Sequence, residues 1–253
     1  MLDHIQSLLS KFSSTTLKEI EKSALMNRVD EKFVIPLSKL DELLTALQNE
    51  YHVLQINGLN VFQYSSLYFD CKDYRFYLDH HNGRSNRNKV RIRKYCDTGE
   101  TYLEVKKKTK ERTIKKRIKI ADFTTDLSDE NKTFIQNQLG NNADLQAVLY
   151  NDYKRITLIH KTKTERVTFD FDIRSKSVDL RVEKNKLAQL VIVEIKQERA
   201  DRSSILFQTM KAKHIRPLRI SKFCFGIFEL YDNLALKSNR FKPRLMQLHK
   251  VLQ

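Results

Sequence analysis

The chain has 253 residues, which is long enough for one large domain or two small ones with a full hydrophobic core. Its 47 lysines and arginines outnumber its 31 aspartates and glutamates. The resulting formal charge of +16 points to a polyanionic partner, such as nucleic acid, phosphate chains, nucleotides or an acidic membrane surface. The three cysteines are widely spaced and form no C-x-x-C pair, which argues against a disulfide framework or structural zinc and for a reducing compartment.

Neither secretion nor a membrane span is expected. The N-terminal stretch MLDHIQSLLSKF has no basic residues ahead of an apolar core, and the longest central apolar run, Leu190 to Val193, is too short to cross a bilayer. With only 5 glycines and 3 prolines, the chain lacks the composition of a long linker or a disordered tail. We therefore expect one cytoplasmic domain over residues 1–253, with a helical segment at 1–25, a core at about 26–236 and a basic tail at 237–253.

The first part of the chain mixes helices and strands. Residues 1–25 carry a helical pattern that breaks near Ser13 and Ser14, and residues 28–35 form a strand that ends at Pro36. An amphipathic helix is expected at 37–50 and a strand at 61–70, where β-branched and aromatic residues are frequent. Residues 74–80 suit either a strand or a short helix.

Three short strands are expected next, at 89–95, 101–107 and 113–120. The sequence Asp97-Thr98-Gly99 supplies turn chemistry between the first two. Side chains alternate along a strand, so Arg91 and Arg93 share one face of the first strand and apolar residues share the other. The second and third strands repeat this division.

The second half of the chain continues in the same manner. Ser128 is expected to cap a helix that ends at Leu139, with Gly140 just beyond it. The further expected elements are a short helix at 144–148, strands at 154–160 and 165–174, an edge strand at 178–182, a strand at 190–196, a helix from Asp201 to about 213 and a final helix from Ser221 to 234.

At least seven of these strands place charged residues on one face and apolar residues on the other. Such a face can simply be solvated, as on a half-buried antiparallel sheet, or it can line the lumen of a closed sheet. Cations crowded into a lumen repel one another unless a polyanion binds there. The recurrence of the pattern therefore favours a polyanion site. The charged residues are Lys32, Arg91, Arg93, Lys106, Lys115, Arg117, Arg155, Arg166, Asp170, Glu194 and Lys196.

Nine short motifs in this order resemble the VTC (vacuolar transporter chaperone) polyphosphate polymerase domain, a branch of the CYTH or triphosphate tunnel superfamily. The motifs span residues 28 to about 226. They are Arg28-Val-Asp30-Glu-Lys32-Phe, Ser66-Leu-Tyr68-Phe69-Asp70, Val90-Arg91-Ile-Arg93-Lys-Tyr95, Leu103-Glu104-Val-Lys106, Lys115-Lys-Arg117, Tyr153-Lys-Arg155, Arg166-Val-Thr-Phe-Asp170, Val193-Glu194-Ile-Lys196 and Ser221-Lys222-Phe223. The resemblance implies an α+β fold in which an antiparallel β-barrel tunnel has helices packed outside.

The resemblance also implies an activity: transfer of the γ-phosphate of ATP onto a growing polyphosphate chain with Mn²⁺ or Mg²⁺. Lys222, Arg91, Arg93 and Glu194 would be catalytic, and Glu194 would bind the metal. ATP and polyphosphate would be the ligands, a separate protein would supply any membrane coupling, and no specific nucleic acid is expected. The residues that would hold phosphates are Lys32, Arg91, Arg93, Lys106, Lys115, Arg117, Arg155, Arg166, Lys196, Ser221 and Lys222.

Other interpretations stay open. Triphosphatases of this superfamily carry E-x-E-x-K on the first strand, and here Arg28 replaces the first acid, which weakens the case for hydrolysis. A module that binds polyphosphate or nucleotide without turnover, and regulates a membrane partner, is the third possibility. The motifs also have structural interpretations: Glu194–Lys196, Glu104–Lys106 and Arg155 or Arg166 with Asp170 as ion pairs, and Tyr68, Phe69 and Asp70 as core and turn.

Overall fold

A computed structural model describes residues 1–22, 29–110, 112–178, 182–185, 187–231, 236–243 and 246–248. Arg28, part of the predicted edge strand at 178–182 and the end of the predicted final helix lie outside the described residues. The strands are β1 Ser13–Thr15, β2 Val29–Pro36, β3 Tyr51–Leu54, β4 Val61–Cys71, β5 Arg87–Tyr95, β6 Thr101–Thr109, β7 Arg112–Ile120, β8 Leu145–His160, β9 Glu165–Ser177, β10 Glu183–Lys184 and β11 Leu190–Gln197. The helices are α1 Leu2–Leu9, α2 Leu17–Lys22, α3 Leu40–Leu47 after a 3₁₀ turn at Leu37–Lys39, α4 Arg75–His81, α5 Asp129–Leu139, α6 Ile205–Ala212 and α7 Lys222–Leu230.

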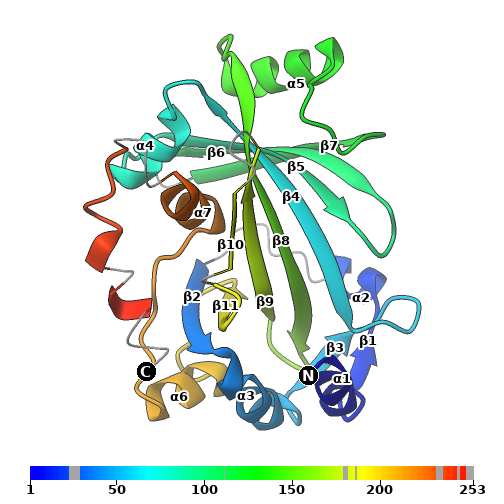
Figure 1. Cartoon of the computed structure of the whole chain (residues 1–253). Coiled ribbons are helices and arrows are strands. Elements are labelled where there is room, and N and C mark those ends of the chain that lie inside the picture. Colours follow the sequence, from blue (N-terminus) through cyan, green and yellow to red (C-terminus); the bar gives the residue numbers. More distant parts are fainter. Residues whose placement is uncertain are drawn as a thin grey trace.

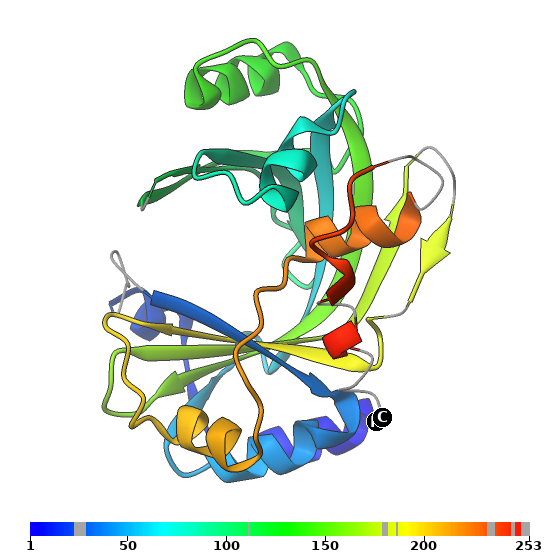
Figure 2. The ribbon, with the colours of Figure 1, turned by 90° about the vertical axis from the view of Figure 1, so that its left-hand side faces the viewer.

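The described strands form one large sheet in the order β2-β11-β9-β8-β4-β5-β6-β7. Every ladder is antiparallel except the short one between β1 and β3, which joins the sheet through β8. Figure 2 shows the sheet bent into a C, with β2 in blue toward one end and β5, β6 and β7 toward the other. The predicted α+β class and large antiparallel sheet are confirmed. The described strands do not close into the expected barrel, because β2 and β7 remain the two edges of the strand order.

Helices α1, α3, α5 and α6 cover the outer, convex side of the bend (Figure 1), whereas α7 lies against the concave side, where Phe223 packs on Tyr68. Near β2 and β11, helices α1, α3 and α6 bury residues such as Leu44 and Leu206 against Phe33 and Val193. Toward the other end, α4 and α5 belong to a second cluster that contains Val105 of β6. The apolar face of each strand is therefore used for packing, which leaves the alternate, polar face on the concave side.

Local signals fixed several helix ends. The Ser128 hydroxyl accepts a hydrogen bond from the Asn131 N–H at 3.2 Å and caps α5, and Gly140 ends that helix with a φ of 77°. Residues 75–81 form a helix, α4, which settles the choice that the sequence left open. The predicted cap at Asp201 is wrong, because α6 begins after Ser204 and the Asp201 carboxylate instead accepts from the N–H of Ser203.

The predicted short helix at 144–148 is also wrong. These residues extend β8, and Leu145, Gln146 and Ala147 pair with residues 69–71 of β4. Because cross-strand pairing satisfies the backbone and buries Val148, it outweighs the weak local helical pattern.

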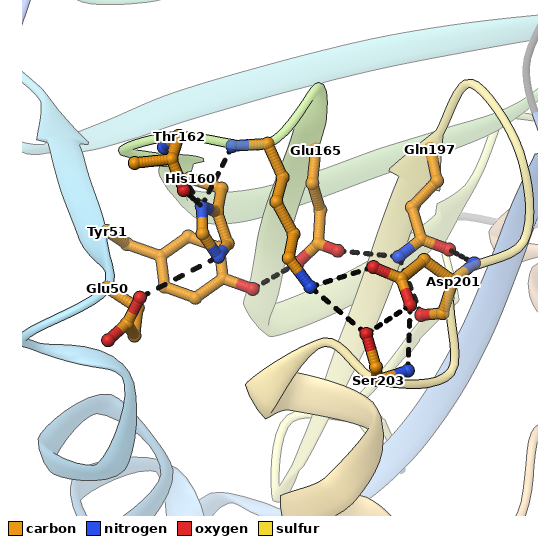
Figure 3. Close-up of polar contacts among 9 residues, drawn as sticks. Glu50, Tyr51, His160, Thr162, Glu165, Gln197, Asp201 and Ser203 are labelled. Atoms are coloured by element: carbon orange, nitrogen blue, oxygen red, sulfur yellow. Dashed lines mark hydrogen bonds and ion pairs between the residues drawn. The ribbon is translucent and has the colours of Figure 1, made fainter.

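A polar network ties the base of the sheet together on its covered side (Figure 3). The Tyr51 hydroxyl donates to the buried Glu165 carboxylate, which also accepts from the Gln197 amide at 2.6 Å. The Gln197 carbonyl oxygen accepts from the N–H of Asp201 at 3.0 Å, and the Asp201 carboxylate binds Lys163 at 2.8 Å. Strands β3, β9 and β11 and the loop before α6 are thereby held in a fixed arrangement behind the concave face.

Candidate functional site

The concave side of the sheet carries a continuous array of charges, which we call the cationic face. Its basic residues come from seven strands: Lys32, Lys89, Arg91, Arg93, Lys106, Lys115, Arg117, Arg155, Arg166 and Lys196. The strand register brings the rows into line, since Lys196 lies opposite Arg166, Arg155 opposite Asp170 and Arg91 opposite Glu104. The predicted site residues on strands therefore share one face, as alternation required.

Glu104 holds the first group of cations. Its carboxylate accepts from Arg91 Nε at 2.7 Å and from Lys115 Nζ at 2.7 Å, and the Glu104 side chain is only 2% exposed. Burial opposes ionisation, but the charges of Arg91, Arg93 and Lys115 hold the pKa of Glu104 well below its usual range. The predicted pairing of Glu104 with Lys106 is wrong, because Arg91 and Lys115 on the two neighbouring strands bind both oxygens of the Glu104 carboxylate.

Asp170 holds the second group. Arg155 donates to both of its carboxylate oxygens, at 2.6 and 2.8 Å, and Lys222 donates to one of them. The predicted structural pairing of Arg155 with Asp170 is confirmed. Burial of Asp170 would raise its pKa, but Arg155 and Lys222 lower it well below the usual range. An ionised, bidentate pair results, in which the Arg155 fork is fixed.

Glu194 holds the third group. Lys32 donates to Glu194 Oε1 at 2.5 Å, and Lys196 lies 3.2 Å from Oε2, so the alternative of a Glu194–Lys196 ion pair is confirmed and extended. Burial opposes ionisation of Glu194, but the two lysines keep its pKa well below the usual range. In this arrangement Glu194 is a carboxylate already bound by two cations.

The N-terminus of α7 lies at the centre of these groups. The Ser221 hydroxyl accepts from the Cys224 N–H at 3.4 Å as a helix cap, and it also accepts from Lys89 Nζ at 2.8 Å. Lys222 reaches Asp170 and lies 4.3 Å from the centre of the Tyr153 ring. The helix is fixed by Gly226, where an added Cβ would come within 2.8 Å of the Leu149 side chain. The start of α7 therefore brings backbone N–H groups to the cationic face.

Several buried polar atoms on the concave face have no hydrogen-bond partner among the described residues: Ser66 Oγ, Arg93 Nε, Tyr153 Oη and Thr168 Oγ1. Arg93 is 7% exposed, and its guanidinium lies 5.6 Å from the centre of the Tyr64 ring. Buried polar groups normally find partners, so this cluster of unpaired atoms is expected where a polar ligand or water binds.

The remaining predicted residues lie nearer the sheet edges. Lys106 is exposed and faces Lys89 and Lys115 on the neighbouring strands, and Arg117 is exposed with its guanidinium 4.6 Å from the centre of the Tyr102 ring. Arg166 lies at the opposite part of the face and donates to the Ile20 carbonyl at 3.4 Å. The structure thus brings Arg91, Lys222 and their partners together, while Arg117 and Arg166 lie on strands at the two sides.

The sequence prediction missed Lys89 and Tyr68 on this face, and it placed Asp170 there only as a structural partner. Lys89 was left out although it alternates with Arg91 and Arg93. Tyr68 was assigned to the core, yet its hydroxyl accepts from Arg91 Nη1 at 3.1 Å. Burial alone would raise the pKa of Tyr68, but the charges of Arg91, Lys89 and Arg93 lower it. Tyr68 lies between the apolar residues Leu67 and Phe69 on β4. Alternation would therefore have placed its side chain on the opposite, polar face.

Among the described residues no group of three or more His, Cys, Asp or Glu side chains could hold a metal ion by itself. The donor set still fits a cation that arrives with phosphate oxygens, since Mg²⁺ and similar ions bind through one or two carboxylates plus substrate phosphates. Glu194 offers one such carboxylate once a phosphate neutralises Lys32 or Lys196. No helix in the described part of the chain is long and apolar enough to cross a membrane.

Residues 27–231 match the model of the VTC domain family, and the chain belongs to that family. A comparison with curated protein sequences gives no significant match.

Among solved structures, a candidate adenylyl cyclase from Hippeastrum, reported to have a dominant triphosphatase activity, is similar with a TM-score of 0.49 and 15% identity over 81% of this chain and 95% of its own. A candidate adenylate cyclase from Bacillus halodurans is similar with a TM-score of 0.48 and 12% identity over 77% of this chain and 94% of its own.

Proposed function

We propose that this protein is a polyphosphate polymerase, which transfers the γ-phosphate of ATP onto a polyphosphate chain bound along the cationic face. The observation that carries the proposal is the convergence of basic side chains from seven strands on the concave face at the start of α7, where Lys222, Ser221 and Lys89 meet. Membership of the VTC family supports phosphate chains and nucleoside triphosphates as ligands.

The residues fit the demands of phosphoryl transfer. This reaction needs charge neutralisation and in-line positioning more than a covalent nucleophile. Arg91 and Arg93 can bind phosphate oxygens with their planar guanidinium groups, while Lys222 and the N–H groups at the start of α7 can neutralise a terminal phosphate. The terminal phosphate of the growing chain can itself act as acceptor, so the reaction needs no general base.

A divalent cation, Mn²⁺ or Mg²⁺, would supply further charge neutralisation between neighbouring phosphates. Glu194 is the residue of this chain that would hold it, together with the phosphate oxygens of the substrate. Lys32 and Lys196, which bind Glu194 in this structure, would then turn to phosphate.

The test is incubation of the purified protein with ATP and Mn²⁺, followed by gel separation of the products and staining for polyphosphate. A ladder of long chains is expected from the wild type, and none from Lys222→Ala or Arg91→Ala. Lys116→Ala is the matched control, because Lys116 is an exposed lysine on the other face of β7. Retained synthesis in both site variants would overturn the proposal.

A second candidate function is a binding module without turnover. The pairing of Glu194 with two lysines favours it, because a carboxylate engaged in this way is not free to bind a metal. Tight polyphosphate binding with no product from ATP would support this candidate. Free phosphate without chains would instead indicate a triphosphatase.

A further inference from the structure

We call each pair of directly opposed residues on neighbouring strands a rung. On the cationic face, the rungs at the start of β5 and the end of β6 place like charges opposite each other. Arg87 faces Lys108, and Lys89 faces Lys106, which in turn faces Lys115 of β7. Like charges in directly opposed positions destabilise a sheet. The next rung differs, since Arg91 faces and binds Glu104.

Carboxylates do not compensate these first rungs. In the described ranges no carboxylate lies within ion-pair distance of Arg87, Lys106 or Lys108, and Arg87 donates instead to the Arg84 carbonyl at 2.9 Å. Lys89 is held by the neutral hydroxyl of Ser221. The rungs are thus a surplus of positive charge that the fold keeps uncompensated by its own acids.

The crowding also changes the titration of neighbouring groups. Desolvation within the concave face, together with the charges of Lys89 and Lys32, lowers the pKa of Lys106 to about 8. Desolvation and the charges of Lys89 and Arg87 likewise lower the pKa of His80 on α4, so that this ring stays neutral. A bound polyanion would relieve the repulsion.

Arg87 and Lys108 also line a cavity of about 950 Å³ between α4, the loop at 84–88 and the loop at 141–144. Figure 1 shows α4 at this end of the sheet, where it packs against β5. The acids that line the cavity already have partners, because Asp73 binds Arg75, Asp79 binds Arg84 and Asp144 binds Lys72. Lys107 donates to the Leu139 carbonyl. The cavity therefore retains excess positive charge where it meets the cationic face.

We propose that Arg87, Lys89, Lys106 and Lys108 form a chain-holding subsite, which binds the distal phosphates of a linear polyphosphate as it passes from the cationic face toward this cavity. The inference rests on the proposed function for the identity of the ligand. Arg87 lies four residues from Arg91 along β5, about 13 Å at the rise of a strand. A triphosphate bound at Arg91 and Ser221 already lies beside Lys89, which donates to Ser221, so Arg87 and Lys108 are the residues that only a longer chain is expected to reach.

The test measures binding without nucleotide, so that failure of polymerase activity does not affect it. Tripolyphosphate and a long polyphosphate are titrated against the wild type and the double variant Arg87→Gln/Lys108→Gln at several salt concentrations. The double variant is expected to bind the long chain about tenfold or more weakly, with a smaller salt dependence, because charge-assisted contacts and released counterions are lost. Tripolyphosphate affinity is expected to change by less than about twofold.

The matched control is Lys116→Gln/Lys132→Gln, which removes the same two charges from exposed positions outside the cationic face. Loss of long-chain affinity in the double variant but not in the control supports the subsite. An equal loss for tripolyphosphate and the long chain, or a long-chain loss no larger than in the control, overturns it. Failure of any polyphosphate to bind the wild type would overturn both the subsite and the proposed function, and long-chain binding without synthesis would overturn only the latter.

Discussion

Removal of the Asp170 charge is the sharpest test of how the cationic face is held in the absence of phosphate. Asp170 is 2% exposed, and its carboxylate binds Arg155 through both oxygens and Lys222 through one. Arg155 cannot swing out to solvent, because its guanidinium lies over the rings of Tyr64 and Tyr153, 5.2 and 5.4 Å from their centres. Asp170→Asn therefore leaves two buried cations without a counter-charge.

The expected cost follows from that burial. Breaking a buried ion pair by removing one partner costs about 3–5 kcal/mol, since the remaining charge stays desolvated. For a protein of this size, each 1 kcal/mol lowers the melting temperature by about 2–4 °C, so we expect a decrease of roughly 6–20 °C. A triphosphate should replace the lost charge and raise the melting temperature of the variant more than that of the wild type.

The assay is thermal unfolding with and without tripolyphosphate. Asp172→Asn is the matched control on the same strand, because the Asp172 carboxylate is 19% exposed and pairs with the partly exposed Lys154 and Arg174. We expect that control to lose about 1 kcal/mol or less. If Asp170→Asn is no less stable than Asp172→Asn, or if tripolyphosphate stabilises it no more than the wild type, the reasoning about uncompensated charge is refuted.

Three further results are expected. Gly226→Ala should cost about 1–3 kcal/mol in a denaturant titration and weaken phosphate binding, because the added Cβ would push α7 away from Leu149; unchanged stability would show that the helix can shift freely. Phosphate-chain affinity should fall as pH rises through about 8, where Lys106 and Lys115 lose their charges, and calorimetry should show proton uptake on binding that Lys106→Arg reduces; equal uptake in that variant would show that Lys106 does not contribute. Because the pKa values of Glu104 and Asp170 are lowered on folding, the stability that they contribute is present above about pH 4.5 and lost progressively below it; an acid-unfolding curve that Glu104→Gln does not flatten would contradict this.

Alternation along strands predicted the cationic face well. It requires only that side chains point to opposite sides in turn, and this rule placed Arg91, Arg93 and Arg155 correctly without knowledge of the strand order. The same rule also places Lys89 and Tyr68 on the cationic face. Tyr68 was missed because residue type, rather than parity, decided its assignment, and Lys89 was left out as the first residue of the expected strand.

Alternation along the strands could not predict which charged side chains of the cationic face pair with each other. Glu104 was paired with Lys106 by proximity in sequence, but Arg91 and Lys115 on the neighbouring strands bind its carboxylate, whereas Glu194 does contact Lys196, two residues away on its own strand. The contact of Lys32 with Glu194 depends on the register between β2 and β11, strands that lie at opposite ends of the chain. Register and strand order follow from packing of the whole sheet, which no local pattern contains.

When no ligand is bound, the three carboxylates Glu104, Asp170 and Glu194 pair with cations of the cationic face that a phosphate ligand would bind. Each carboxylate is buried or nearly so and is bound by two cations. An incoming anion must therefore compete for these cations with carboxylates that belong to the protein and stay beside them. A single orthophosphate gains too few contacts to compete with all three at once. A linked row of phosphates competes at every position together, and its affinity should rise steeply with length before it levels off. The acids would thus set a minimum chain length for entry, a threshold imposed by the protein's own negative charges.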